Sequence, residues 1–138
     1  MTLTKTLPVL VLAVALAACG GDDVSVEGLR ADSRPYYWVG DSFEELELTH
    51  AEPYQGRFAN LIYGTCDPPR AFVFLSEGGC APPLAVQNVL CEDGSATVAL
   101  FSHGGGLSAR AAKALRPLND ASRRAGRPRV TFDRSMLC

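Results

Sequence analysis

The sequence predicts a small α+β protein with a mainly antiparallel sheet of five to six strands, one covering helix at about residues 108–118, and two disulfides. Three observations predict this fold class. Short apolar segments with strand preference alternate with turns that contain glycine, proline or aspartate. Apolar residues recur at helical spacing in one segment. After the first cysteine an even number of cysteines follows, namely Cys66, Cys80, Cys91 and Cys138.

The first 18 residues have the composition of an export signal. Lys5 provides a positive charge, and the apolar run from Leu7 to Ala18 contains no charged residue. A membrane-spanning helix needs about 20 apolar residues, so this run is too short to be one.

The end of this segment, Leu16-Ala17-Ala18-Cys19, resembles the lipobox of bacterial lipoproteins. The resemblance implies that residues 1–18 are a lipoprotein signal peptide and that Cys19 carries the lipid. It also implies an extracytoplasmic protein that is anchored to the cell membrane by this lipid. A plain secretion signal without lipid is the alternative, because small residues also precede ordinary cleavage sites.

The rest of the chain is expected to be a tether followed by one domain. Glycine, aspartate and serine dominate residues 19–35, which predicts a flexible tether. Residues 36–138 are enough for a single disulfide-stapled domain. A solute-binding protein with two lobes needs a longer chain, which excludes that class of lipoprotein.

The domain is expected to begin with a strand at the aromatic run Tyr36–Val39. Ser42 and Glu45 have the spacing of a capping box, which predicts one short helical turn. From Glu45 to Thr49 apolar and polar residues alternate, which predicts a half-buried strand with its leucines inward. The remaining expected strands cover residues 58–63, 84–90, 96–102 and 130–132, and residues 71–75 form a further strand or a loop.

The one expected helix opens at Ser108. Its apolar stripe consists of Leu107, Ala111, Leu115 and Leu118. Pro117 is expected to end or kink this helix, because proline lacks the backbone N–H that the next turn requires.

The four later cysteines predict two disulfides, which form in oxidising compartments. If strands 58–63 and 84–90 pair antiparallel, Cys66 and Cys80 face each other across the neck of the connecting loop. Cys91 is then left for Cys138. The other two pairings stay open. A zinc site is disfavoured because the cysteines are 14, 11 and 47 residues apart, without a close pair.

Charge is distributed unevenly along the chain, whose formal net charge is −2. Acidic residues predominate from Asp22 to Asp93, and basic residues predominate from Gly94 to Cys138. Pairing of the two halves inside the molecule is one interpretation. The other is that the arginine-rich segment 123–129 contacts anionic lipid headgroups, which attract basic residues. Nucleic acid is not an expected partner for an exported chain of negative net charge.

One segment, His103-Gly104-Gly105-Gly106, resembles the oxyanion-hole segment of lipases and esterases. The Gly-x-Ser-x-Gly motif of that family is absent from the sequence. The most similar segment begins with Gly106-Leu107-Ser108 but has Arg110 in place of the last glycine. A loop between a strand and a helix accounts for the glycines equally well.

His50 and His103 are the two histidines of the sequence, and either is a candidate general base with Asp41 or Glu52 beside it. Their spacing is not that of a metal site. The acidic stretch from Asp41 to Glu52 does not complete a calcium loop either, because leucines interrupt it. We therefore expect no catalytic residue, no metal site and no cofactor.

The aromatic residues of the domain have two interpretations. They either belong to the core or form a surface for sugars or peptides. The residues concerned are Tyr36, Tyr37, Trp38 and Tyr54.

Cys66-Asp-Pro-Pro, Cys80-Ala-Pro-Pro and the run Tyr36–Gly40 resemble a group of short, uncharacterised lipoproteins of high-GC bacteria. This resemblance implies no functional residues. We expect a lipid-anchored, extracytoplasmic, non-enzymatic protein that binds an unknown protein or envelope ligand or has a structural role. One alternative is a secreted inhibitor-like or ligand-binding module with an exposed loop Phe72–Leu75, and the other is a small hydrolase that uses His103.

Overall fold

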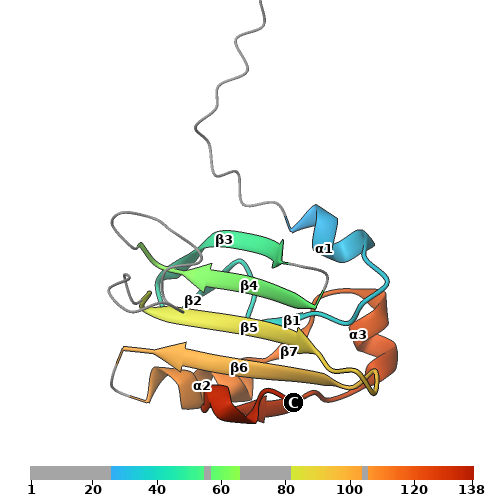
Figure 1. Ribbon diagram of the computed structural model, residues 1–138. Coiled ribbons are helices and arrows are strands. Elements are labelled where there is room, and N and C mark those ends of the chain that lie inside the picture. Colours follow the sequence, from blue (N-terminus) through green and yellow to red (C-terminus); the bar gives the residue numbers. More distant parts are fainter. Residues whose placement is uncertain (1–25, 55–56, 66–81, 104–105) are drawn as a thin grey trace, which may run out of the picture.

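The computed structural model describes residues 26–54, 57–65, 82–103 and 106–138. Its centre is a curled six-stranded sheet with the strand order β2-β3-β4-β5-β6-β8 (Figure 1). All neighbouring strands are antiparallel except β6 and β8, which are parallel. The strands are β2 Ser42–Phe43, β3 Leu46–Tyr54, β4 Phe58–Tyr63, β5 Leu84–Leu90, β6 Ala96–Ser102 and β8 Arg129–Thr131.

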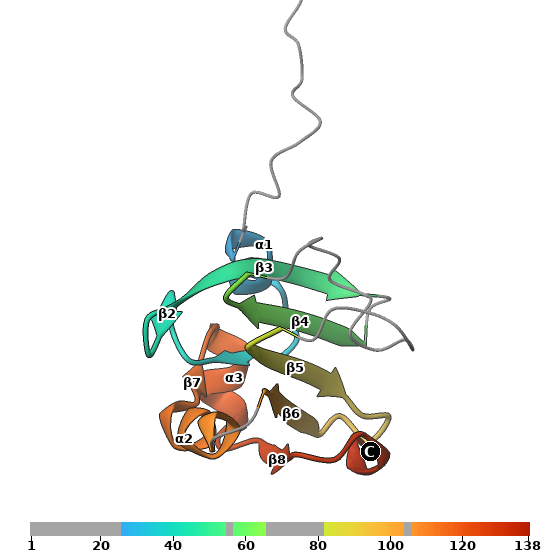
Figure 2. The ribbon, with the colours of Figure 1, turned by 90° about the vertical axis from the view of Figure 1, so that its left-hand side faces the viewer.

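A second layer covers one face of this sheet. It contains the two-stranded sheet of β1 and β7 and the three α-helices. In Figure 2, β7, α2 and α3 lie together to the left of the strands, and α1 lies above β3. A 3-10 turn, Arg134–Met136, follows β8. The elements of the layer are β1 Tyr37–Trp38, β7 Arg116–Pro117, α1 Glu27–Ala31, α2 Leu107–Ala114 and α3 Asp120–Ala125. Among the described residues, no helix has the length and apolar character needed to cross a membrane.

The predicted fold class is confirmed at the level of an α+β protein with a mainly antiparallel sheet. Three of the expected strands, residues 58–63, 84–90 and 96–102, have the bounds of β4, β5 and β6. The prediction of one helix over 108–118 is wrong, because α2 ends at Ala114 and two further helices are present. The chain turns to extended geometry at Leu115, and Arg116 and Pro117 then pair with β1. Pro117 disfavours helix at the residue before it, Arg116.

The predicted tether is corrected in its second half. Residues 27–31 form α1, and its Leu29 side chain is fully buried in the main core. The Arg30 guanidinium lies 5.1 Å from the centre of the Trp38 ring. The buried Leu29 side chain, together with contacts from Arg30 and Asn119, holds a segment for which the polar composition predicts a flexible tether. Residues 19–25 lie outside the described residues.

The predicted capping box at Ser42 and Glu45 is wrong. These residues belong to a hairpin in which Phe43 pairs with Leu46. Glu44 and Glu45 form its two-residue turn, with φ of 46° and 69°. Positive φ at both central positions is typical of the turn that matches the twist of a hairpin, although glycine or asparagine is preferred there.

The aromatic run belongs to the core, which lies between the sheet and the covering layer. Tyr36, Tyr37 and Trp38 are at most 5% exposed. The backbone N–H of Tyr37 donates to Asn88 Oδ1 at 2.8 Å, and Asn88 Nδ2 donates to the Tyr37 carbonyl at 2.9 Å. This buried amide of β5 therefore holds β1 against the inner face of the sheet.

One of the two expected disulfides is present. Cys91, directly after β5, is bonded to Cys138. This confirms the preferred partner of Cys138. The second expected pair, Cys66 and Cys80, lies outside the described residues.

Asp32 gives the fold a predictable pH dependence. Hydrogen bonds from the Arg34 side chain, one of them 2.9 Å from Nε to Oδ1, lower the pKa of Asp32 from 3.8 to about 2. The ionised carboxylate therefore stabilises the fold above pH 4 by about 2 kcal/mol, and this contribution is lost as the pH falls towards 2. We expect the free energy of unfolding of Asp32→Asn, measured in urea between pH 5 and pH 2, not to show this decrease at low pH. Asp120→Asn, at a carboxylate that is 77% exposed, serves as the control and should change the profile little.

Candidate functional site

The face of the sheet turned away from the helices carries a row of polar side chains across three strands. In register, Glu52 of β3 is opposite Asn60 of β4, and Asn60 is opposite Gln87 of β5. Side chains alternate between faces along a strand, and Ala59 and Leu61 point into the main core. Asn60 therefore points to the outer face. This face of the sheet is turned towards the viewer in Figure 1. We call Asn60 and Gln87 the amide pair.

Apolar residues flank the amide pair on both sides. Ile62 and Ala85 form a small buried cluster of their own, against which Phe101 packs. On the other side, Val89 of β5 is 5% exposed and lies between its register neighbours on β4 and β6. On the outer face the amide pair thus lies between Ile62 and Ala85 on one side and Val89 on the other.

The amide pair is buried and carries unused hydrogen-bond acceptors. Asn60 and Gln87 are each 2% exposed. Their carbonyl oxygens, Asn60 Oδ1 and Gln87 Oε1, have no hydrogen-bond partner within the described part of the chain. Buried polar atoms in native proteins are nearly always paired, and leaving one unpaired costs about 1–3 kcal/mol. Two adjacent acceptors of this kind are suited to receive N–H or O–H donors.

A β-bulge places His50 beside this row. Leu48 pairs with Tyr63, which faces the core, but His50 pairs with Ile62, which faces outward. The extra residue is Thr49, whose hydroxyl donates to the Gly64 carbonyl at 2.7 Å. The bulge reverses the alternation, so half-buried His50 shares the outer face with Glu52.

The structure does not bring the two histidines together. His50 lies on β3, and exposed His103 follows β6, with β4 and β5 between them. Three strand spacings separate their backbones by about 14 Å. The Ser108 hydroxyl, next to the glycine segment, lies 2.6 Å from the Ser102 hydroxyl. Gly104 and Gly105 lie outside the described residues.

No metal site is found where the structure describes the chain, since three or more His, Cys, Asp or Glu side chains do not gather there. The acidic residues of the β2–β3 hairpin, Asp41, Glu44, Glu45 and Glu47, are exposed. Cys91 and Cys138, in the disulfide, are the cysteines that can be placed. Cys19, the expected lipid-attachment residue, lies outside the described residues.

Comparisons of the chain with models of protein families, with curated proteins and with solved structures found no match. The candidate site therefore depends on the geometry of the outer face.

The amide pair was not predicted from the sequence, although the sequence contains an indication of it. Asn60 interrupts the apolar strand Phe58–Tyr63, and Gln87 interrupts Leu84–Leu90. A polar residue at a central position of a buried strand needs a partner. Asn88 gives the same signal and has a structural role against Tyr37, so sequence alone does not separate the two cases.

Proposed function

We propose that this chain is a lipid-anchored, non-catalytic binding protein of the extracytoplasmic space, and that its ligand contacts the amide pair. The observation that carries the proposal is the pair of buried, cross-strand carbonyl oxygens of Asn60 and Gln87 without a partner in the described chain. A ligand that donates hydrogen bonds to both would remove the cost of their burial.

The position of the amide pair suggests the chemical class of the ligand. The carbonyl oxygens accept hydrogen bonds, and the neighbouring Ile62 and Val89, which are 4% and 5% exposed, are apolar. Ligands with this combination have O–H or N–H groups along an apolar ring or chain, as sugars and amides do. Glu52, next in the row, favours a neutral or positively charged ligand.

Two features support the proposed location. The lipobox-like segment that ends at Cys19 predicts export and lipid attachment. The Cys91–Cys138 disulfide suits an oxidising compartment, because disulfides are rare in the reducing cytosol.

Lipid attachment is tested by mass and fractionation. We expect the mature chain to begin at Cys19 and to carry acyl chains, because the thiol of this residue is the attachment point. A Cys19→Ser variant should leave the washed membrane fraction or remain uncleaved. Recovery of an unmodified wild-type chain from the medium would contradict the anchor.

Ligand binding is tested by comparing buried amides. Without ligand, Asn60→Leu and Gln87→Leu should unfold within about 1 kcal/mol of the wild type, because each removes an unpaired acceptor. Asn88→Leu is the matched control on the inner face. Its free energy of unfolding should fall by roughly 2–4 kcal/mol, because two backbone groups of Tyr37 lose their hydrogen-bond partner.

The same variants then identify the ligand class. In a thermal-shift screen of neutral sugars, amino sugars and short peptides, a true ligand should raise the melting temperature of the wild type and not that of Asn60→Leu. If Asn60→Leu and Gln87→Leu lose as much free energy of unfolding as Asn88→Leu, the two amides are already hydrogen-bonded in the folded protein. That result would overturn the proposed site.

A further inference from the structure

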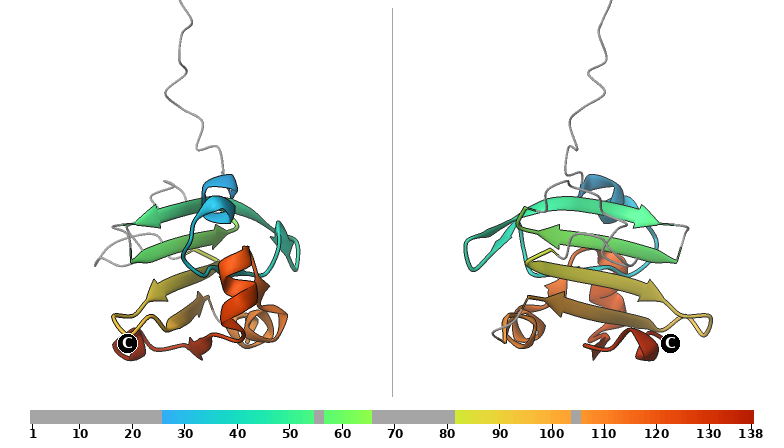
Figure 3. Two further views of the ribbon diagram at one scale, coloured as in Figure 1. Left: turned by 90° about the vertical axis from the view of Figure 1, so that its right-hand side faces the viewer. Right: turned by 60° about the vertical axis from the view of Figure 1, so that its left-hand side comes forward.

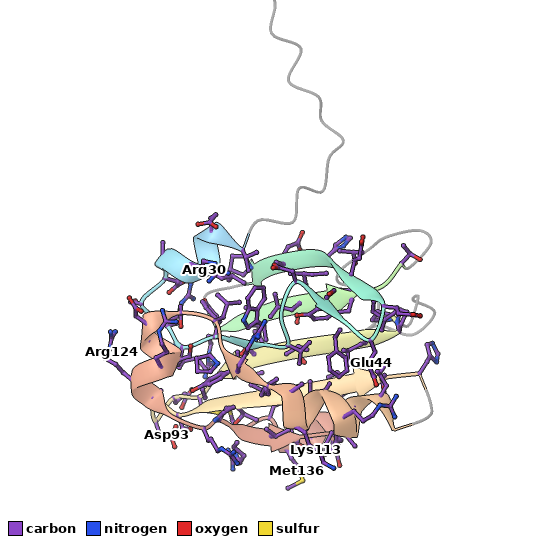
Figure 4. All side chains as sticks on the ribbon, turned by 180° about the vertical axis from the view of Figure 1, so that it is seen from behind. Arg30, Glu44, Asp93, Lys113, Arg124 and Met136 are labelled. Atoms are coloured by element: carbon purple, nitrogen blue, oxygen red, sulfur yellow. A yellow bond between two sulfur atoms is a disulfide. The ribbon has the colours of Figure 1, made fainter. Side chains whose placement is uncertain are left out.

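Arginines are concentrated at the end of the molecule where α1 meets α3. The Asn119 side chain, at the start of α3, donates to the Leu29 carbonyl of α1 at 3.0 Å. Arg30 Nη1 donates to the Leu118 carbonyl at 3.4 Å. The left view of Figure 3 shows α1 directly above α3, and Figure 4 shows Arg30 and Arg124 at this same end.

The arginines of this end differ in whether a carboxylate is paired with them. Arg124 and Arg127 are exposed, and neither forms an ion pair with a described residue. Arg123 is paired with Asp120 at 2.6 Å, and Arg127 and Arg129 both line a hollow that also contains Asp93. Arg30 is 4.0 Å from the Glu27 carboxylate of its own helix. We call the surface formed by Arg30, Arg124 and Arg127 the arginine end.

The acidic β2–β3 hairpin lies at the other end of the molecule, whereas Glu27, Asp93 and Asp120 lie near the arginine end. Glu44, in the turn of the β2–β3 hairpin, is on the side opposite Arg30 and Arg124 in Figure 4. The ion pair between Arg110 and Glu44, 2.7 Å long, joins the basic and acidic halves of the sequence there. The ion pairs among the described residues therefore do not include Arg124 and Arg127, and the acidic hairpin lies on the opposite side of the molecule.

The proposed anchor attaches beside the arginine end. Val26, which precedes α1, is seven residues from Cys19 in the sequence. Seven extended residues span at most about 25 Å, so α1 is held within this distance of the lipid. Electrostatic attraction acts over a Debye length of about 8–10 Å, which is a large part of that range.

We infer, on the basis of the proposed anchor at Cys19, that the arginine end docks on the anionic phosphate headgroups of the membrane surface. Guanidinium groups bind phosphate oxygens in a two-pronged geometry, and each basic residue near an anionic surface strengthens binding about fivefold. Docking in this orientation directs the acidic hairpin away from the membrane.

Chemical labelling of individual arginines tests the orientation. The acylated protein is reconstituted in vesicles of phosphatidylcholine, with or without phosphatidylglycerol, and phenylglyoxal modification is measured by peptide mass mapping. On anionic vesicles we expect Arg124 and Arg127 to react about fivefold more slowly than on neutral ones. At about 1 M salt, where the Debye length is about 3 Å, the difference should vanish. Arg110 is the internal reference and should react equally on both.

A charge-reversal pair adds a control. In Arg124→Glu/Arg127→Glu, protection of Arg30 on anionic vesicles should be lost, whereas Lys113→Glu on α2 should preserve it. Equal labelling of Arg124 and Arg127 on both vesicle types overturns the orientation, and so does equal protection of Arg110. The N-terminal mass from the same digest distinguishes failure of the docking proposal from failure of the anchor proposal. If the chain is acylated but its arginines are not protected, only the docking is wrong. If the chain is not acylated, the anchor is wrong.

Discussion

Asn119→Ala is expected to lower the free energy of unfolding by roughly 3–5 kcal/mol, because one buried side chain joins α1, β1 and α3. Its Oδ1 accepts from the backbone N–H groups of Ser122 at 3.0 Å and Tyr36 at 3.3 Å. Its Nδ2 donates to three backbone carbonyls, those of Leu29, Asp32 and Arg34. Alanine leaves these groups buried without a partner and also removes the N-cap of α3.

Urea unfolding measures this loss. Asp120→Ala, one residue further on, is the control, because it removes an exposed ion pair with Arg123 and should cost less than about 1 kcal/mol. A loss below about 1 kcal/mol in Asn119→Ala as well would mean that α1 is not held by this residue. The arginine end would then lack a fixed arrangement.

The sequence was a good guide where each strand is bounded by its own turn. The segments Phe58–Tyr63, Leu84–Leu90 and Ala96–Ser102 are apolar runs that end at turn residues, and the structure has strands with those bounds. The helix α3 was not predicted, although Asn119 and Ser122 form its capping box. Six residues are too few for an apolar stripe, so the cap was its main signal.

The outer face was harder to predict because it depends on register. The bulge at Thr49 turns His50 to the outside, whereas the alternation of Leu46 and Leu48 predicts an inward position. The proximity of Asn60 and Gln87 also requires the pairing of β4 with β5. Asn60 and Gln87 are 27 positions apart along the chain and meet only after the sheet has formed, so local patterns carry little information about this row.

Removal of the Cys91–Cys138 disulfide should have an effect of similar size. The bond closes a ring that, in the chain-entropy model, stabilises the fold by about 4 kcal/mol. The ring holds β8, a three-residue edge strand whose contact with the sheet is a short parallel pairing to β6. Strands of this length contribute little alone, so the segment after α3 depends on the covalent bond.

We expect the double variant Cys91→Ser/Cys138→Ser to lose roughly 2–4 kcal/mol in urea unfolding, with the largest rise in hydrogen exchange at β8. Replacing both cysteines avoids a free thiol that would seek a new partner. Ser135→Ala, in the exposed turn before Cys138, is the control and should stay within about 0.5 kcal/mol of the wild type. Unchanged stability in the double variant would show that non-covalent contacts hold β8 in place. In that case the disulfide would no longer explain why so short a strand stays at the edge of the sheet.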